Sequence, residues 1–121
     1  MKNFEINWEY LKGAKKEKRI NRVGMEYPYS EGAIPFPDYI DRTARTMLTS
    51  EGSLNRSTHV INDLSSGRLR LLTPVECERI NEFPDHWTAI GMPESWRHFT
   101  MGNALVVGVV KKLADEIIGF F

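Results

Sequence analysis

Residues 68–87 read RLRLLTPVECERINEFPDHW, and the rest of the chain is organised around this stretch. Leu69 and Leu71 alternate with two arginines, a pattern typical of a short strand with one buried face. Thr73 is a good helix N-cap, the proline after it suits the first helical position, and Glu76 completes a capping box. The stretch therefore predicts a strand that leads into a short, well-capped helix.

The predicted helix has an apolar side and a defined end. Val75, Cys77 and Ile80 give it an inward face. Phe83-Pro84 ends it, because the residue before a proline is pushed out of the α region. A strand and a capped helix carry no chemistry by themselves.

The letters of this stretch match a known motif. LTPVECERINEFPDHW resembles the ninth conserved block of the DNA (cytosine-5) methyltransferases, which reads R-x-L-T-P-x-E-x-x-R-L-x-G-F-P-D. The matching residues are Arg70, Leu72, Thr73, Pro74, Glu76, Arg79, Phe83, Pro84 and Asp85. Ile80 stands where the family has leucine, and Glu82 stands where it has glycine. If that glycine has a positive φ, a glutamate there costs about 1 kcal/mol.

A second block follows at the spacing that the family uses. Residues 101–107, MGNALVV, resemble the tenth block, G-N-[AS]-V-V-x-x-V. Because both blocks occur in order, about twenty residues apart, the chain resembles the C-terminal part of a bacterial or phage DNA (cytosine-5) methyltransferase. The resemblance covers roughly residues 12–118, which correspond to about the last third of a full enzyme.

The resemblance implies a division of the chain and a set of partners. Residues 12–67 correspond to the target-recognition region, 68–87 to block nine and 101–118 to the helix of block ten. In the family, the Gly-Asn turn of block ten lines the pocket for S-adenosylmethionine. Contacts with this cofactor are implied for Asn103, Ala104 and Leu105. The implied partners are double-stranded DNA and a catalytic domain or subunit that this chain does not contain.

The family's catalytic motifs are missing from the sequence. Its members attack cytosine C6 with a cysteine from a Pro-Cys motif, helped by a glutamate from a Glu-Asn-Val motif, on a base flipped out of the duplex. Neither motif occurs here, nor does a glycine-rich turn for the cofactor. The single cysteine, Cys77, lies between Glu76 and Glu78, whose charges raise a thiol pKa. No catalytic residue is assigned, and the chain alone is predicted to be inactive.

Composition sets the fold class and the setting. The 121 residues fit a single α+β domain of short strands, irregular loops, a capped helix and a long C-terminal helix. The resemblance implies that this domain is one part of a two-domain methyltransferase. A formal net charge of zero means that any DNA contact depends on local patches. The lone cysteine and the lack of a signal peptide predict a bacterial cytoplasmic protein, and the longest apolar run, residues 104–110, is too short to span a membrane. The three histidines show no metal-site spacing, and His86 and His98 are predicted to be surface or hydrogen-bonded structural residues.

The recognition region offers two groups of candidates for DNA contact. Residues 12–22 hold six basic residues against one acid, and form either a solvated loop or a strip that contacts phosphates. Residues 44–61 are predicted to form a hairpin with strands at 44–49 and 58–61, whose side chains suit hydrogen bonds to base edges. The predicted DNA-binding residues are Lys15, Lys16, Lys18, Arg19, Arg45, Thr46, Ser50, Asn55, Arg56, Ser57 and His59.

A further resemblance supports the second group. ARTMLTSEG, residues 44–52, resembles the SRTIITGEG type of sequence in the recognition region of some bacterial enzymes of the family. The family's Thr-Leu/Ile/Val pair then falls on Thr46-Met47, with Thr43-Ala44 as the second choice.

The two ends of the chain are predicted as follows. Residues 4–10 alternate like a strand, with a helical turn through Trp8 and Leu11 as the rival. A short helix from Pro93 places Trp96 and Phe99 inward together, and Asn103 is the predicted N-cap of the last helix. That helix is apolar on nearly all sides at its start. It therefore needs a partner, and in isolation the chain is predicted to self-associate.

Two readings of the whole remain open, besides a chance match in a protein-interaction domain. The chain is the recognition and C-terminal part of a restriction-modification methyltransferase, either as an excised fragment or as one subunit of a split enzyme. Alternatively, it is a free-standing DNA-binding remnant that transfers no methyl group.

Overall fold

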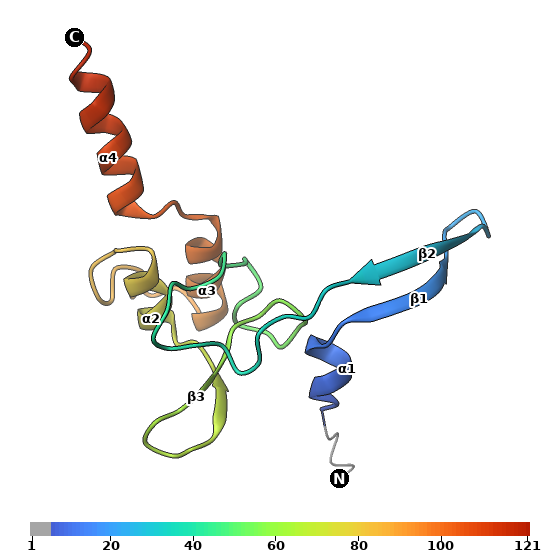
Figure 1. Ribbon diagram of the computed structural model, residues 1–121. Coiled ribbons are helices and arrows are strands. Elements are labelled where there is room, and N and C mark those ends of the chain that lie inside the picture. The colour runs from blue at the N-terminus through green and yellow to red at the C-terminus, as the bar shows by residue number, and fades with distance from the viewer. Residues whose placement is uncertain (1–5) are drawn as a thin grey trace.

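The computed structural model describes residues 6–121 of the chain (Figure 1). Its elements are α1 (Trp8–Lys12), β1 (Lys15–Ile20), β2 (Glu26–Glu31), β3 (Val60–Asn62), β4 (Leu69–Leu71), α2 (Pro74–Ile80), α3 (Glu94–Asn103) and α4 (Val107–Ile118). Short antiparallel strands and helices together confirm the predicted α+β class. No helix within residues 6–121 has the length and apolar character needed to cross a membrane.

The strands form two separate antiparallel hairpins. In the first, β1 pairs with β2, with Lys15 opposite Glu31 and Ile20 opposite Glu26. In the second, β3 pairs with β4, with Val60 opposite Leu71. The first hairpin follows α1 and projects away from α2, α3 and α4 in Figure 1, whereas the second leads directly into α2.

A small core joins α2, α3 and the loop before β3. Met47, Leu72, Cys77 and Met101 are buried in it, and the partly buried Ile61, Ile80, Phe83 and Ala104 pack around them. The strand at residues 69–71, the capped helix and the inward positions of Cys77 and Ile80 are confirmed. The predicted buried face of the strand is wrong for Leu69, which is 41% exposed, and Val75 does not belong to this core. Because the core collects side chains from residues 47 to 104, it holds the second half of the chain together.

Several predictions for the first half of the chain are wrong. Residues 8–12 form α1, as the rival prediction had it, because the Asn7 side chain accepts a hydrogen bond from Tyr10 N at 2.9 Å and caps the helix. The first residues of the predicted strand at 4–10 lie outside the described residues. Within 12–22, residues 15–20 form β1 rather than a loop.

The predicted hairpin at 44–61 is also wrong. Residues 44–49 form a loop, and the partner of β3 is β4. Glu51 turns inward, and its carboxylate accepts hydrogen bonds from the backbone N–H of Leu48 at 3.1 Å and of His59 at 2.9 Å. The Leu48 N–H therefore bonds to a side chain instead of to a facing strand.

The start of the last helix differs from the prediction as well. Helix α3 continues through Asn103, whose side chain donates to Phe99 O at 3.1 Å, so Asn103 is not an N-cap. Gly102 lies against the backbone of Leu48 and Thr49, where any Cβ would collide. Helix α4 begins only at Val107, after an extended connection.

The aromatic residues of α3 and the whole of α4 face solvent. Trp96 is 60% exposed and Phe99 is 47% exposed, so the prediction that they face inward is wrong; their rings pack on each other with centroids 5.9 Å apart. Helix α4 has no buried residue and extends away from the other elements in Figure 1. Its apolar side chains therefore lack cover within residues 6–121.

Candidate functional site

The residues of the block-nine motif build a rigid frame around the start of α2. Arg70 donates from Nη1 and Nη2 to the two oxygens of Glu76, at 2.8 and 2.9 Å. Glu76 Oε2 also accepts from Thr73 N at 2.8 Å, which closes the predicted capping box. The hydrogen bonds from Arg70 outweigh burial and lower the pKa of Glu76 to about 2. These motif residues therefore hold β4 and the start of α2 together.

The end of α2 is fixed in a similar way. Arg79 donates from Nε and Nη2 to the carboxylate of Asp85, at 2.8 and 2.6 Å. The buried carboxylate of Glu78 accepts from the backbone of His86 at 2.7 Å and of Thr88 at 2.9 Å, and from Arg97 at 3.1 Å. The loop after the motif is thus tied to α2 and α3.

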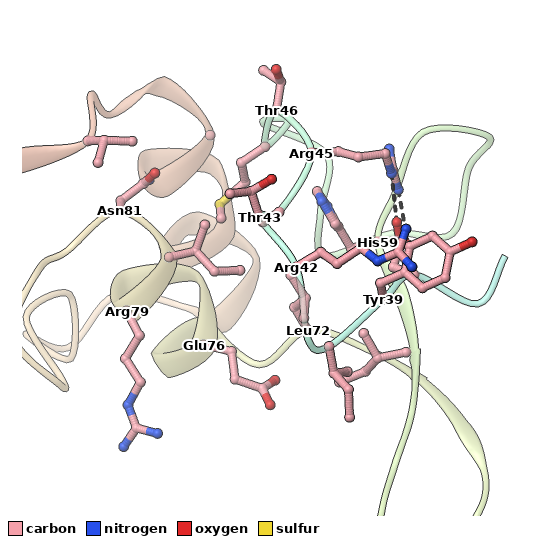
Figure 2. A pocket seen from close by; sticks show the side chains of 18 of the residues that line it. Tyr39, Arg42, Thr43, Arg45, Thr46, His59, Leu72, Glu76, Arg79 and Asn81 are labelled. Atoms are coloured by element: carbon pink, nitrogen blue, oxygen red, sulfur yellow. Dashed lines mark hydrogen bonds and ion pairs between the residues drawn. The ribbon is translucent and has the colours of Figure 1, made fainter. Parts of the chain in front are cut away.

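A cleft of about 840 Å³ lies between α2 and the loop of residues 35–47 (Figure 2). Figure 2 shows Arg42, Thr43 and Thr46 on the loop side, across from Glu76 and Arg79 of α2. The cleft brings together three predicted DNA-binding residues, Arg45, Thr46 and His59, and two predicted cofactor residues, Ala104 and Leu105. The third cofactor candidate, Asn103, is exposed and does not line the cleft.

Two of the predicted DNA-binding arginines are engaged inside the protein. Arg45 binds the carboxylate of Asp38 at 2.6 and 3.0 Å and donates to Ser57 O at 3.0 Å. Arg56 donates to the backbone oxygens of residues 11 and 13, at 3.1 and 3.0 Å, and of Gly32, and it pairs with Glu31 at 2.9 Å. Both guanidinium groups hold loops in place.

Lys12 has the same role, which its place in a basic segment did not reveal. Its side chain is buried, and Nζ donates to the carbonyls of Arg56 at 2.8 Å, Thr58 at 2.5 Å and Asn55 at 3.3 Å. Burial lowers its pKa. A lysine that binds three carbonyls of one loop fixes the conformation of residues 55–58.

The same loop is tied by its own polar side chains. Asn55 Oδ1 accepts from Ser57 N at 2.9 Å and Thr58 N at 3.0 Å, and Asn55 Nδ2 donates to Ser50 Oγ at 3.0 Å. His59 is buried, with Nδ1 2.9 Å from Glu51 Oε1. Burial raises the pKa of Glu51, but hydrogen bonds from the side chain and backbone of His59 outweigh it and the net shift is downward.

The predicted basic residues of the first hairpin divide between its two faces. Lys15 and Arg19 lie on one face, where Lys15 pairs with Glu31 at 3.9 Å and the Arg19 guanidinium lies 3.4 Å from the centroid of the Tyr29 ring. Lys16 and Lys18 lie on the other face and are exposed. On the second face Lys18 pairs with Glu26 at 3.3 Å, but both side chains are largely exposed, so this face is the more accessible to a phosphate.

Arg42 is a cleft residue that sequence reasoning missed. It is exposed, and its guanidinium lies 4.3 Å from the centroid of the Tyr39 ring. The only signal in the sequence was a spacing of three between an aromatic and a basic residue, which is too common to be noticed. In the structure, Arg42 is the exposed arginine of the cleft loop, whereas Arg45 is bound to Asp38.

Comparison with known proteins places this frame and cleft in a family. The profile of the family described as C-5 cytosine-specific DNA methylase matches residues 3–119. This chain belongs to the C-5 cytosine-specific DNA methylase family. It is 51% identical over 110 residues to the type II methyltransferase M.Sau3AI of Staphylococcus aureus, a match that covers 91% of this chain and 26% of that protein. The chain therefore spans about a quarter of the length of this methylase relative. No solved structure matches it.

The thiol in this part of a methylase is not built as a nucleophile. Cys77 is fully buried in the core, and burial, with help from Glu51, Glu76 and Glu78, raises its pKa to about 12. A thiol with that pKa is not ionised at neutral pH. Among residues 6–121, no cluster of three or more His, Cys, Asp or Glu side chains could hold a metal ion.

Proposed function

We propose that this chain is the target-recognition and C-terminal part of a DNA (cytosine-5) methyltransferase of restriction-modification type. It binds double-stranded DNA and completes the S-adenosylmethionine pocket of a catalytic part, without which it transfers no methyl group. The observation that carries the proposal is the cleft at α2, where the loop of residues 35–47 meets Ala104 and Leu105 of block ten. Recognition and cofactor candidates thus share one site in a member of this family.

DNA contact comes from the basic and polar side chains that the fold leaves exposed. Lys16 and Lys18 are exposed on the projecting hairpin, and Arg42 and Thr46 are exposed at the mouth of the cleft. Lysine and arginine bind phosphates, and arginine also reads base edges. Arg45, Asn55, Arg56, Ser57 and His59 support this contact by holding the loops, and Ser50, exposed beside Asn55, remains a candidate for direct contact.

The residues at the end of α3 fit a role at the edge of a cofactor pocket. Leu105 is 73% exposed and Ala104 is partly buried, so both present apolar surface to a neighbouring ligand. Asn103 is exposed beside them and offers a polar side chain. S-adenosylmethionine, the methyl donor that the family uses, has both an aromatic base and polar groups that such a surface suits.

The partner that supplies catalysis is proposed to cover α4. Val110, Leu113 and Ile117 are exposed by 43, 59 and 59% on this helix, and their spacing of three and four places them on one side. A contiguous apolar side of this kind marks an interaction surface. The catalytic part of the methyltransferase is the occupant that the proposal requires.

A complementation assay tests the proposal. This chain is mixed with the catalytic part of a related methyltransferase, and transfer of labelled methyl groups from S-adenosylmethionine to DNA is followed. Transfer only in the mixture supports the proposal, and sequencing of the product gives the target. Salt-dependent DNA binding without transfer would favour a free-standing DNA-binding remnant instead. If the mixture shows no methyl transfer and the chain alone shows no DNA binding, both proposals are refuted.

A further inference from the structure

The turn of residues 81 and 82, directly after α2, contacts the ends of two other helices. Asn81 Nδ2 donates to Met101 O in the last turn of α3 at 2.8 Å. Asn81 O accepts from Val107 N at the start of α4 at 3.0 Å. Glu82 Oε2 accepts from Gly108 N, one residue further into α4, at 2.5 Å. The turn therefore satisfies two backbone donors of the first turn of α4.

These two bonds replace a cap that α4 does not have. The residue at the N-cap position is Val106, which has no polar side-chain atom and makes no capping hydrogen bond. The first N–H groups of a helix have no partner within the helix, and a carboxylate beside them is favoured by the helix dipole. Glu82 supplies that carboxylate from a residue 26 positions earlier in the chain.

The backbone of Glu82 shows that this contact is held at a cost. Its φ is 62°, in the left-handed region that glycine adopts readily and glutamate does not. Glycine would therefore suit the backbone of this turn better. What glutamate adds is its side chain, which lies on α4.

Gly108 is the matching partner of this carboxylate. A Cβ at position 108 would collide with Glu82 Oε2. The side chain of Glu82 thus occupies the space that any larger residue at position 108 would need. Since α4 buries none of its residues, packing on the rest of the described chain does not fix its direction.

We infer that Glu82 and Gly108 form a matched pair that caps α4 and sets the direction in which this helix leaves the recognition part of the chain. Glu82 is a positioning residue: it orients the apolar surface of α4 without touching DNA or cofactor. The inference concerns contacts within this chain and stands whether or not the proposed function holds.

The first test separates the effect of the capping carboxylate of Glu82 from the cost of its left-handed backbone conformation. Glu82→Ala removes the carboxylate but keeps a Cβ in the left-handed turn, whereas Glu82→Gly removes the carboxylate and the backbone cost together. Amide hydrogen exchange of residues 107–110 is measured by NMR, with the amides of α2 as an internal reference. Loss of the cap is expected to speed exchange at Gly108 about fivefold in both variants, with α2 unchanged. Glu94→Ala, an exposed acid in the first turn of α3, is the matched control and leaves α4 unchanged.

The second test uses the pairing itself. Alanine normally stabilises a helix relative to glycine. Gly108→Ala in the Glu82→Ala background is therefore expected to slow exchange in α4 about threefold, whereas Gly108→Ala alone displaces the carboxylate and gives no slowing. Equal slowing in both backgrounds, or unchanged exchange in Glu82→Ala, overturns the inference.

The direction of α4 is measured separately from its stability. Spin labels on Ser95→Cys of α3 and Glu116→Cys of α4 report the distance between these helices, and both positions are exposed while the native Cys77 is buried. The distance distribution is expected to broaden in Glu82→Ala and to stay narrow in Glu94→Ala. A narrow, unshifted distribution in Glu82→Ala would show that Glu82 does not position α4.

Discussion

Glu76→Gln should lower the free energy of unfolding markedly, although it replaces only one carboxylate oxygen by an amide group. Glu76 receives both ends of the Arg70 guanidinium, at 2.8 and 2.9 Å, and caps the first turn of α2 through Thr73. A fall in pKa from 4.5 to about 2 corresponds to about 3.4 kcal/mol at full strength. Because the Glu76 side chain is 30% exposed, water screens part of this, and we expect a loss of about 2 kcal/mol at neutral pH.

The pH dependence of that loss gives the sharper test. The pKa of Glu76 is lowered in the folded state, so its stabilisation is complete above the unfolded value of 4.5 and disappears as pH falls toward 2. Urea unfolding of the wild type and Glu76→Gln, followed by tryptophan fluorescence, should therefore differ by about 2 kcal/mol at pH 7 and by less than half of that near pH 3. Glu94→Gln, an exposed acid in the first turn of α3, is the control and should change stability by under about 0.5 kcal/mol. A difference that stays constant between pH 7 and pH 3 would refute the assignment of the stabilisation to the carboxylate charge.

Further predictions concern the frame, the exposed helix and DNA binding. Lys12→Met should cost about 2–4 kcal/mol in urea unfolding, because three backbone carbonyls lose a buried donor, while Lys18→Met on the exposed hairpin face should be nearly neutral. Gly102→Ala should cost about 1–3 kcal/mol, since its Cβ would meet the backbone of residues 48–49; Gly32→Ala, where a Cβ meets nothing, is the control for thermal unfolding. In isolation the chain should self-associate through α4 at tens of micromolar, and light scattering that shows only monomer would count against this. Double-stranded DNA binding should show a slope of log K against log salt of about −4.

The part of the fold that the sequence predicts is the part whose signals are local. The capping box of Thr73 and Glu76, the proline between them and the Phe83-Pro84 stop all act within a few residues, and α2 forms where they predict it. Family motifs add to this, because their residues turn out to hold one another. The structure around block nine can be predicted from the sequence because its hydrogen bonds join residues only three to six positions apart, such as Thr73 and Arg70 with Glu76.

The first hairpin was missed for the opposite reason. Its turn had a signal, because Asn21 Oδ1 accepts from Val23 N and Met25 N and Gly24 takes a φ of 83°. Its strands had none, since the half-buried face of β1 carries Lys15, Glu17 and Arg19 rather than apolar side chains, so no apolar alternation is present. The loop of residues 44–59 was mistaken for strands because Glu51 and Lys12, whose bonds organise it, reach partners across many positions.

The same limit applies to Glu82. The sequence predicted the cost of a glutamate where glycine is usual, and the φ of 62° confirms that the position lies in the left-handed region. The compensating contact with Gly108 was out of reach, because it joins residues 26 positions apart. A departure from a family motif can therefore mark a new contact rather than a defect.

The division of basic residues between buried and exposed positions sets the salt dependence expected if this chain binds DNA as proposed. Residues 12–67 contain nine lysines and arginines, a number that predicts a salt slope of about −8 if all of them neutralise phosphates. In the structure only Lys16, Lys18, Arg22 and Arg42 are exposed, whereas Lys12, Arg45 and Arg56 bind carbonyls and carboxylates inside the fold. Lys18 pairs with Glu26 at 3.3 Å and Arg42 with Asp41 at 3.9 Å, both at the surface. If all four exposed cations neutralise phosphates, the expected slope is about −4. A measured slope near −8 would mean that the inward-facing cations leave their partners when DNA binds. The loops that Lys12, Arg45 and Arg56 hold would then open in the complex.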